Sequence, residues 1–275
     1  MSASARLGDG KTVLITGASG GIGYELATCF ARDGFGLILV SRAQTALERV
    51  ATELGQAYGV AVTALAADLG QPGSAAQLHG ELRRRGLAVD VLVNNAGVGM
   101  HGPFVELDPQ KELEMIQLNL ISLTQLTRLF LPEMLARRSG QVMNLASTAA
   151  FPPGPYMAVY YATKAYVLLF SEALGFELRS SGVTVTAFCP GPTKTGFQAR
   201  SKIEGTVLFQ WGGMPAARVA RIGYRGLMRG QPVVVAGVLN TLLVFMLRMF
   251  PRRGATAVSG WLASNKNRPH RAQAG

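Results

Sequence analysis

Cysteine is scarce in this sequence of 275 residues: only Cys29 and Cys189 are present, and neither belongs to a CxxC or Cys/His metal spacing. Two such residues exclude a framework of several disulfide bridges, and no metal site is expected. The first apolar run, Thr12 to Thr16, is also too short for the hydrophobic stretch of a secretion signal. We therefore expect a reducing, cytoplasmic setting.

Acidic residues are almost absent from the C-terminal third. Residues 194–275 hold 13 Lys and Arg but one acid, Glu204, whereas residues 1–193 hold 14 basic and 15 acidic residues. The two parts therefore carry +12 and −1, and the whole surplus lies after residue 193. No zinc pattern, RNA-binding aromatic signature or heptad repeat accompanies it, so we expect no nucleic-acid partner. The surplus instead raises the question of what the basic third contacts.

Short β-branched runs alternate with longer helical stretches along the chain. This alternation predicts βαβ units around one parallel, doubly wound sheet with helices on both faces. The expected strands are 12–16, 36–41, 61–66, 89–94, 140–146, 183–188 and 232–236, and the expected helices are near 22–33, 43–58, 74–86, 109–137, 157–180, 214–229 and 238–250. We expect one α/β domain over residues 1–264, followed by a basic, disordered tail at 265–275.

A glycine-rich turn joins the first expected strand to the first helix. Glycines let a backbone approach a diphosphate closely, and a helix N-terminus presents unpaired N–H groups to its charge. The turn supplies Gly17, Ser19, Gly20, Gly21, Ile22 and Gly23 as candidate cofactor contacts. The spacing is GxxxGxG, so this motif predicts a dinucleotide site only together with its strand-turn-helix setting.

The second expected strand ends in Ser41 and Arg42, where an NAD enzyme would carry a carboxylate for the ribose 2'-hydroxyl. A carboxylate would repel a 2'-phosphate, whereas Arg42 can pair with it. We therefore expect NADP(H) rather than NAD(H). An ordinary exposed arginine is the alternative interpretation of Arg42.

Three further motifs make the sequence resemble the short-chain dehydrogenase/reductase family. Asn94-Asn95-Ala96-Gly97 follows the fourth strand, Tyr160 and Lys164 form YxxxK, and Pro190-Gly191 ends the sixth strand. The resemblance spans residues 11–236 in consistent order. It implies a Rossmann-like domain and hydride transfer between a nicotinamide and a carbonyl or alcohol. It also implies a homodimer or homotetramer built on the helices near 109–137 and 157–180.

The resemblance carries over site residues one by one. The implied catalytic set is Asn119, Ser147, Tyr160 and Lys164. The implied cofactor contacts, besides those of the glycine turn and Ser41-Arg42, are Asp68, Leu69, Asn95, Ala96, Gly97, Tyr160, Lys164, Pro190, Gly191, Thr193 and Thr195. Cys189 precedes the last of these segments and is expected to be a buried packing residue.

The chemistry explains why these residue types are needed. A free tyrosine has a pKa of about 10, too high for ready proton exchange at neutral pH, and a neighbouring cation is expected to lower it. Residues i and i+4 share a helix face, so Lys164 should lie under Tyr160, whereas Tyr161 points elsewhere. Ser147 would hydrogen-bond the substrate oxygen, and Asn119 would return protons through the lysine and water.

The apolar residues of two segments suggest a lipophilic ketone, aldehyde or alcohol as substrate. Residues 192–214 contain Phe197, Ile203 and Trp211 and are expected to form a lid, and residues 151–157 add further apolar wall. Packing of the lid on the protein itself explains the same composition equally well.

The stretch 238–250 predicts a helix with more apolar surface than one core contact requires. Arg248, Arg252 and Arg253 flank its end. A contact with protein or the core is one interpretation, and a peripheral membrane contact through 238–253 is the other.

Three functions remain open from the sequence. The first is an NADPH-dependent carbonyl reductase or the reverse alcohol dehydrogenase. The second is a 3-oxoacyl-thioester reductase, whose basic third would bind an acidic carrier protein. The third is a non-catalytic NADP-sensing module, against which the complete set of Asn119, Ser147, Tyr160 and Lys164 argues.

Overall fold

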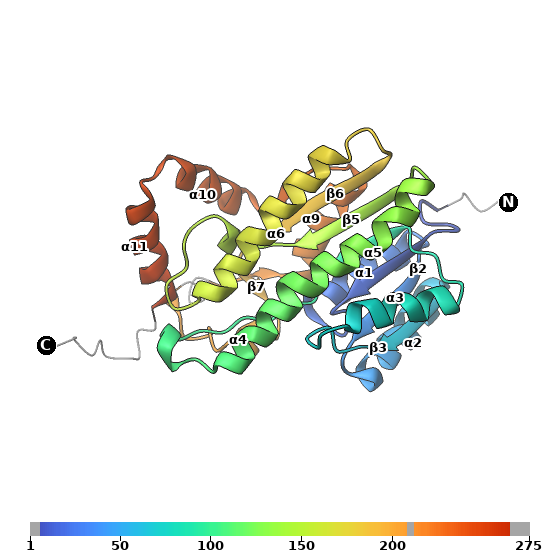
Figure 1. Ribbon diagram of the computed structural model, residues 1–275, viewed down its shortest axis with the longest axis horizontal. Coiled ribbons are helices and arrows are strands. Elements are labelled where there is room, and N and C mark those ends of the chain that lie inside the picture. Colours follow the sequence, from blue (N-terminus) through green and yellow to red (C-terminus); the bar gives the residue numbers. More distant parts are fainter. Residues whose placement is uncertain (1–5, 208–211, 265–275) are drawn as a thin grey trace, which may run out of the picture.

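A seven-stranded parallel sheet forms the centre of the molecule in the computed structural model, which describes residues 6–207 and 212–264 (Figure 1). The strand order is β3-β2-β1-β4-β5-β6-β9. The strands are β1 (Thr12–Thr16), β2 (Gly36–Ser41), β3 (Val62–Ala66), β4 (Val91–Asn94), β5 (Gly140–Leu145), β6 (Val183–Cys189) and β9 (Val233–Val235). The order reverses between β1 and β4, which places the ligand-binding crevice of a doubly wound sheet at the carboxyl ends of these two strands.

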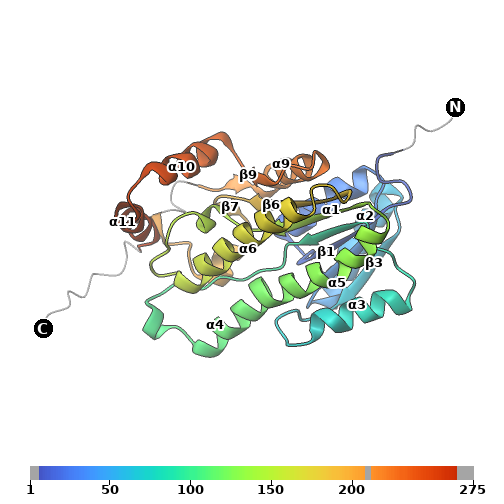
Figure 2. The ribbon, with the colours of Figure 1, turned by 45° about the horizontal axis from the view of Figure 1, so that its top comes forward.

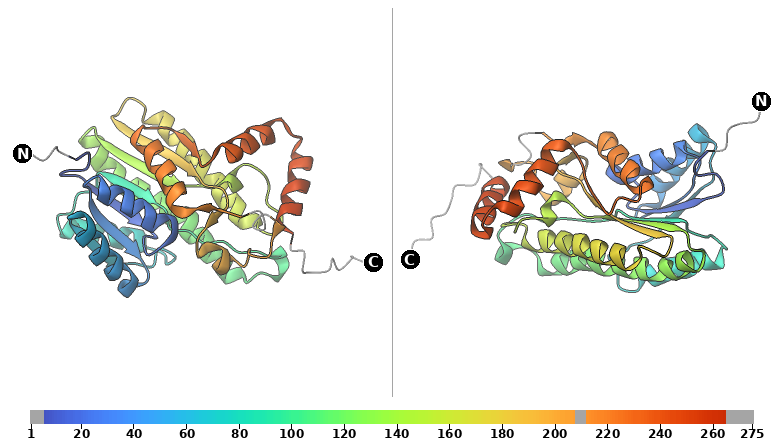
Figure 3. Two further views of the ribbon diagram at one scale, coloured as in Figure 1. Left: turned by 180° about the vertical axis from the view of Figure 1, so that it is seen from behind. Right: turned by 90° about the horizontal axis from the view of Figure 1, so that it is seen from above.

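Helices cover both faces of the sheet (Figure 3). One face carries α1 (Gly21–Arg32), α2 (Gln44–Tyr58) and α9 (Ala216–Met228), and the other carries α3 (Ser74–Arg84), α4 (Pro109–Ile116), α5 (Leu123–Ala136) and α6 (Ala158–Glu177). Successive residues of a strand point to opposite faces, so Val13 and Ile15 join one buried cluster and Leu14 joins the other. Burial on both faces explains why the strands are almost continuously apolar.

The expected doubly wound sheet and all seven of its strands are confirmed, with bounds that differ by two residues at most. The helix expected over 109–137 is α4 and α5 joined by the π-helical segment η2 (Gln117–Ser122). The short helix α7 (Phe197–Ser201) and the two-residue strands β7 (Thr193–Lys194) and β8 (Met214–Pro215) were not expected. They lie in the segment that follows β6.

Two helices at the C-terminal side, α10 (Val238–Met249) and α11 (Arg252–Ala263), pack at the end of the molecule away from α2 and α3 (Figures 1 and 2). Pro251 separates them, because a proline disfavours helical backbone at the preceding Phe250, which is extended. Among the described residues no helix is long and apolar enough to cross a bilayer. The tail expected at 265–275 lies outside the described residues.

Candidate active site

The glycine turn between β1 and α1 is held by an asparagine from the neighbouring strand end. The Asn95 side chain donates hydrogen bonds to the carbonyl oxygens of Thr16 (2.8 Å) and Gly17 (3.1 Å). Gly17 has a φ of +68°, and a Cβ at Gly23 would lie 2.3 Å from the Gly17 carbonyl oxygen. The turn therefore needs glycine at both positions, which explains the motif.

The N-terminus of α1 opens into the same crevice. Gly20 precedes the helix, and in the described part of the chain no side chain caps the N–H groups of its first turn. A Cβ at Gly20 would meet no atom within 4 Å, so the backbone there is open to a ligand. Unpaired N–H groups at a helix N-terminus favour an anion such as a diphosphate.

The ends of β2 and β3 supply polar groups to the crevice. Among the described residues the buried Ser41 hydroxyl has no hydrogen-bond partner, and the Arg42 side chain that follows it is exposed. No acidic residue lies in the first turn of the following helix α2. The Asp68 carboxylate accepts a hydrogen bond from the Gly70 N–H (3.0 Å) and keeps its other oxygen for further contacts. A 2'-phosphate therefore finds an unused hydroxyl and a cation at this place.

One continuous cavity of about 650 Å³ runs from this crevice to α10 and α11. It brings together nearly all residues expected from the sequence. Those that line it are Gly17, Ser19, Gly20, Gly21, Ile22, Ser41, Arg42, Asp68, Leu69, Asn95, Ala96, Gly97, Ser147, Tyr160, Lys164, Pro190, Gly191, Thr193 and Thr195. Only Gly23 and Asn119 do not line it.

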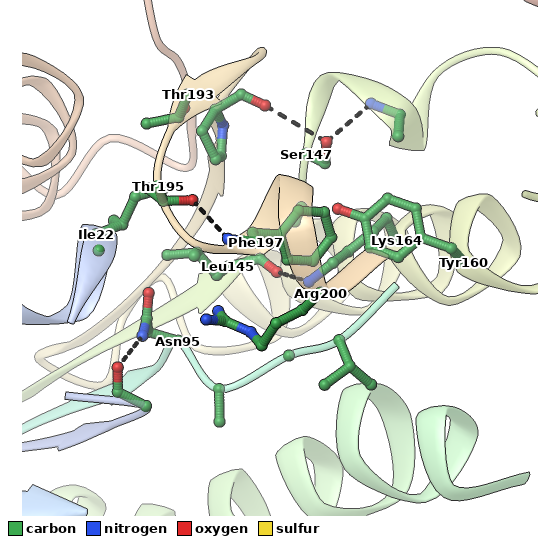
Figure 4. Close-up of a pocket in the computed structure, with 18 of the residues that line it drawn as sticks. Ile22, Asn95, Leu145, Ser147, Tyr160, Lys164, Thr193, Thr195, Phe197 and Arg200 are labelled. Carbon is green, nitrogen blue, oxygen red and sulfur yellow. Dashed lines mark hydrogen bonds between the residues drawn. The ribbon is translucent and has the colours of Figure 1, made fainter. Parts of the chain in front are cut away.

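Tyr160, Lys164 and Ser147 meet at one end of the cavity (Figure 4). The two hydroxyl-bearing side chains come from α6 and from the end of β5. The Lys164 ammonium lies 5.8 Å from the centre of the Tyr160 ring and donates a hydrogen bond to the Leu145 carbonyl oxygen (2.7 Å). The Ser147 hydroxyl oxygen accepts the Ala149 N–H at 3.1 Å and lies 3.4 Å from the Pro190 carbonyl oxygen. Lys164 therefore lies on the same helix face as Tyr160, as the i, i+4 spacing predicts.

Burial is the main cause of the pKa shifts of Tyr160 and Lys164. It raises the pKa of Tyr160 well above 10, an increase that the nearby Ser147 hydroxyl opposes. It also lowers the pKa of Lys164 to about 8. The expectation that the tyrosine pKa is lowered is thus wrong, because burial raises it. The physical reason is that the free energy needed to remove a phenolate from water is larger than the stabilisation it would gain from an ammonium that is directed at Leu145.

Asn119 belongs to the π-helical segment η2 and lies near Lys164, on the other side of the cavity wall. Its amide oxygen accepts the Val98 N–H (3.0 Å), and its amide nitrogen donates to the Val98 carbonyl oxygen (2.9 Å) and to the Thr163 hydroxyl (3.2 Å). A Cβ at Gly97 would lie 3.2 Å from the Asn119 oxygen and 3.5 Å from the Lys164 ammonium. Asn119 therefore holds the strand end that forms the cavity wall, and it lies next to the lysine without lining the cavity.

The segment after Pro190 folds back over the glycine turn. A Cβ at Gly21 would lie 3.3 Å from the Thr195 side chain, and the Thr195 hydroxyl accepts the Phe197 N–H (3.2 Å). The Phe197 ring lies 5.6 Å from the Tyr160 ring. This contact positions α7 against the tyrosine and covers it from one side (Figure 4).

Several lining residues were not expected from the sequence. Arg200 of α7 lines the cavity and carries a cation into it (Figure 4). Further apolar wall comes from α10 and α11, through Leu243, Val244, Leu247, Val258 and Leu262. Arg200 could have been predicted, because it is a basic residue within the expected lid. No sequence motif indicates α11, and this helix was not predicted.

These residues fit a bound nicotinamide dinucleotide. The glycine turn and the α1 N-terminus suit its diphosphate, the unused Ser41 hydroxyl and Arg42 suit a ribose 2'-phosphate, and Tyr160 lies at the other end of the same cavity. In the described part of the chain no group of His, Cys, Asp and Glu side chains could hold a metal ion. The fold and the site together define a dinucleotide-binding protein of the Rossmann type.

Comparison with known families identifies the group within this class. The family model of the short chain dehydrogenases matches residues 11–204, and the chain belongs to this family of oxidoreductases. The resemblance carried by the four sequence motifs is therefore confirmed.

Three similar proteins show how far the likeness extends. A very-long-chain 3-oxoacyl-CoA reductase-B of Danio rerio is 36% identical over 185 residues, which cover 66% of this chain and 59% of that protein. A short-chain dehydrogenase of Sphingobium yanoikuyae in complex with NADPH has 33% identity and a TM-score of 0.80, with 96% and 98% of the two chains covered. A bulky-bulky ketone specific alcohol dehydrogenase of Comamonas testosteroni has 28% identity and a TM-score of 0.74, with 87% and 92% covered. The match thus spans about three fifths of the Danio rerio relative.

Proposed function

We propose that the protein is an NADP(H)-dependent oxidoreductase that reduces a lipophilic ketone or aldehyde to an alcohol, or catalyses the reverse reaction. One observation carries the proposal: the Tyr160 and Ser147 hydroxyls and the Lys164 ammonium meet in the cavity that also contains the glycine turn. The NADPH complex of the Sphingobium yanoikuyae relative supports this choice of cofactor, as do Ser41 and Arg42.

Each residue of the site has a separate task in this proposal. The bound nicotinamide would supply or accept a hydride. The Ser147 hydroxyl donates a hydrogen bond to the carbonyl oxygen and stabilises the negative charge that develops there. The Tyr160 hydroxyl donates its proton to the same oxygen, and the buried Lys164 ammonium, 5.8 Å from the centre of the tyrosine ring, would stabilise the phenolate that remains. Asn119 holds the wall beside the lysine, where we place the path by which water returns the proton.

The walls of the cavity favour a substrate with little polarity near its carbonyl. Met157, Phe197, Ile203 and Leu243 line it close to α7 and α10. A cavity lined by apolar side chains and a few hydroxyl groups is typical of binding sites for apolar ligands. The Comamonas testosteroni relative, named for bulky ketones, supports this substrate class.

A 3-oxoacyl thioester is the second candidate substrate. The name of the Danio rerio relative favours it, and so does Arg200, a cation in the cavity that suits an anionic group of a thioester carrier. The non-catalytic sensing module would need none of the proton-transfer set.

We also propose a homodimer or homotetramer and a peripheral membrane contact. Leu113 of α4 and Phe176 of α6 are exposed on the helices that the family resemblance assigns to assembly. On α10, Phe245 is 63% exposed and Met249 is 79% exposed. Exposed apolar surface of this extent marks an interaction site.

NADPH consumption against a panel of carbonyl compounds tests the proposed activity. The panel should contain aliphatic, aromatic and steroid ketones and 3-oxoacyl thioesters, together with a polar sugar ketone as control. We expect lipophilic carbonyls to be reduced and the sugar to react slowly. NADPH binding without reduction of any carbonyl would support the sensing module and contradict the proposal.

A further inference from the structure

A second, smaller cavity lies next to the catalytic one, on the other side of a thin partition. This groove has a volume of about 430 Å³ and lies between α6, the loop after β5 and the junction of α10 and α11. Its walls are mostly apolar and include Phe151, Pro153, Leu168, Leu247, Phe250 and Ala255. Among the described residues that line it, Glu172 and Arg252 are the charged ones, and their signs are opposite.

Leu247 of α10 lines both the groove and the catalytic cavity. The loop that follows Ser147 forms another part of the partition, and α6 and α11 also contribute residues to both cavities. Ala149 and Pro152 of this loop line the catalytic cavity, whereas Ala150, Phe151 and Pro153 line the groove. Leu247 and the loop after Ser147 therefore lie between the groove and the catalytic cavity.

We propose that the groove binds the hydrocarbon tail of a long-chain substrate whose carbonyl lies at Tyr160 and Ser147, with Leu247 moving aside to connect the two cavities. This inference rests on the proposed function and adds the substrate class to it. The occupant follows from continuity with the catalytic cavity and from the mostly apolar walls.

The energetic consequence is a dependence on chain length. Each methylene removed from water contributes a free energy that corresponds to roughly a fourfold gain in affinity. Ketones that fill only the catalytic cavity gain nothing from the groove, whereas longer ones do. The kcat/KM of the wild-type protein should therefore rise along a series of methyl ketones from butanone to dodecanone.

Two phenylalanines of the same region offer a matched pair of variants. Phe250 lines the groove and is 57% exposed, whereas Phe245 is 63% exposed and lines neither cavity. Because both side chains are largely exposed, an aspartate should be tolerated at either position. F250D puts a charge into the groove, and F245D puts the same charge outside it.

The experiment measures NADPH oxidation with the ketone series, without vesicles or detergent, for the wild type, F250D and F245D. We expect F250D to lose about tenfold or more in kcat/KM for the longest ketones, equivalent to about two methylenes, with butanone unaffected. F245D should match the wild type throughout. In L247A, which removes the shared side chain, the advantage of long chains should persist or increase.

Three outcomes would overturn the inference. The first is a wild type that reduces short ketones without any gain from chain length, which leaves the proposed function intact. The second is an equal loss of long-chain activity in F250D and F245D. The third is an F250D protein with normal chain-length dependence; if its oligomeric state were also altered, the groove would be an interface between copies. Failure of the proposed function has a different signature, because no ketone of any length would then be reduced.

Discussion

At the scale of single residues, Lys164 shows what burial does to a charge. The residue is 5% exposed, and its ammonium donates a hydrogen bond to the Leu145 carbonyl oxygen. Sequence spacing predicted its position beside Tyr160 but gave the wrong direction for the tyrosine pKa. The reason is that helical spacing specifies a neighbour, whereas a pKa depends on how much water and how many further charges surround the pair.

The pH dependence of stability tests the buried lysine. Its pKa of about 8 lies below the unfolded value of 10.5, so between these values the unfolded chain binds more protons than the folded one. Stability from this group therefore rises as the pH increases from about 8 towards 10. Above pH 10 the raised pKa of Tyr160 acts in the opposite direction.

We expect the unfolding free energy of the wild type, relative to K164M, to increase by about 2 kcal/mol over this window. Urea denaturation of both proteins without cofactor at several pH values measures it. The variant also loses the hydrogen bond to Leu145. This loss changes the difference in unfolding free energy by the same amount at every pH and so does not affect its dependence on pH. A flat or falling difference would show that Lys164 is not a buried charge.

Arg42 gives a second test at this scale. Removing the cation in R42A should weaken NADPH binding by about ten- to a hundredfold, the range for a hydrogen bond to a charged group, and leave NADH binding unchanged. Equilibrium titration with both dinucleotides measures the two affinities. Equal losses for NADPH and NADH would contradict a role for Arg42 at the 2'-phosphate.

At the scale of elements, the junction of β1 and α1 depends on packing inside the protein as well as on its ligand. The glycine motif and its strand-turn-helix setting were predictable, because each signal is local. The clamp by Asn95 was not, since it joins residues about eighty positions apart. The π-helical segment around Asn119 and the helix α11 were unpredictable for a related reason: tertiary contacts, not local periodicity, stabilise them.

Two alanine substitutions separate the roles of glycines in this turn. A Cβ at Gly23 would collide with the Gly17 carbonyl oxygen, so G23A should lower the unfolding free energy by about 1–3 kcal/mol and weaken NADPH binding. G20A meets open space and should cost less than about 1 kcal/mol while still weakening NADPH binding. Thermal unfolding and NADPH titration check both variants. A stable G23A protein would contradict the packing argument.

At the scale of the whole molecule, the charge asymmetry and the exposed helices act together. Residues after Glu204 contain no acid, and α10 and α11 expose Leu239, Phe245, Met249 and Trp261. The other face of α10 lines the catalytic cavity. The doubly wound sheet was predictable from the alternation of strands and helices. The position of α10 and α11 over the cavity was not, because the periodicity of a helix predicts that one face is buried but not which part of the protein it packs against.

Vesicle flotation tests the membrane contact at this scale. We expect the full chain to float with vesicles that contain anionic lipid, and less so at high salt. F245D should reduce flotation because it places a charge on the exposed face of α10. L7D is the matched control, since Leu7 is 56% exposed and lies before β1, outside α10, α11 and the helices proposed for assembly. Equal flotation of all three proteins, or none for the wild type, would end the proposal.

The central claim is that the Tyr160 hydroxyl transfers the proton, and Y160F tests it most directly. Steady-state reduction of the best carbonyl substrate and equilibrium binding of NADPH should be measured on the same preparation. We predict a loss of about a hundred- to ten-thousandfold in kcat, the range for a general acid, with NADPH affinity unchanged. Reduction by Y160F at close to the wild-type rate would contradict the account.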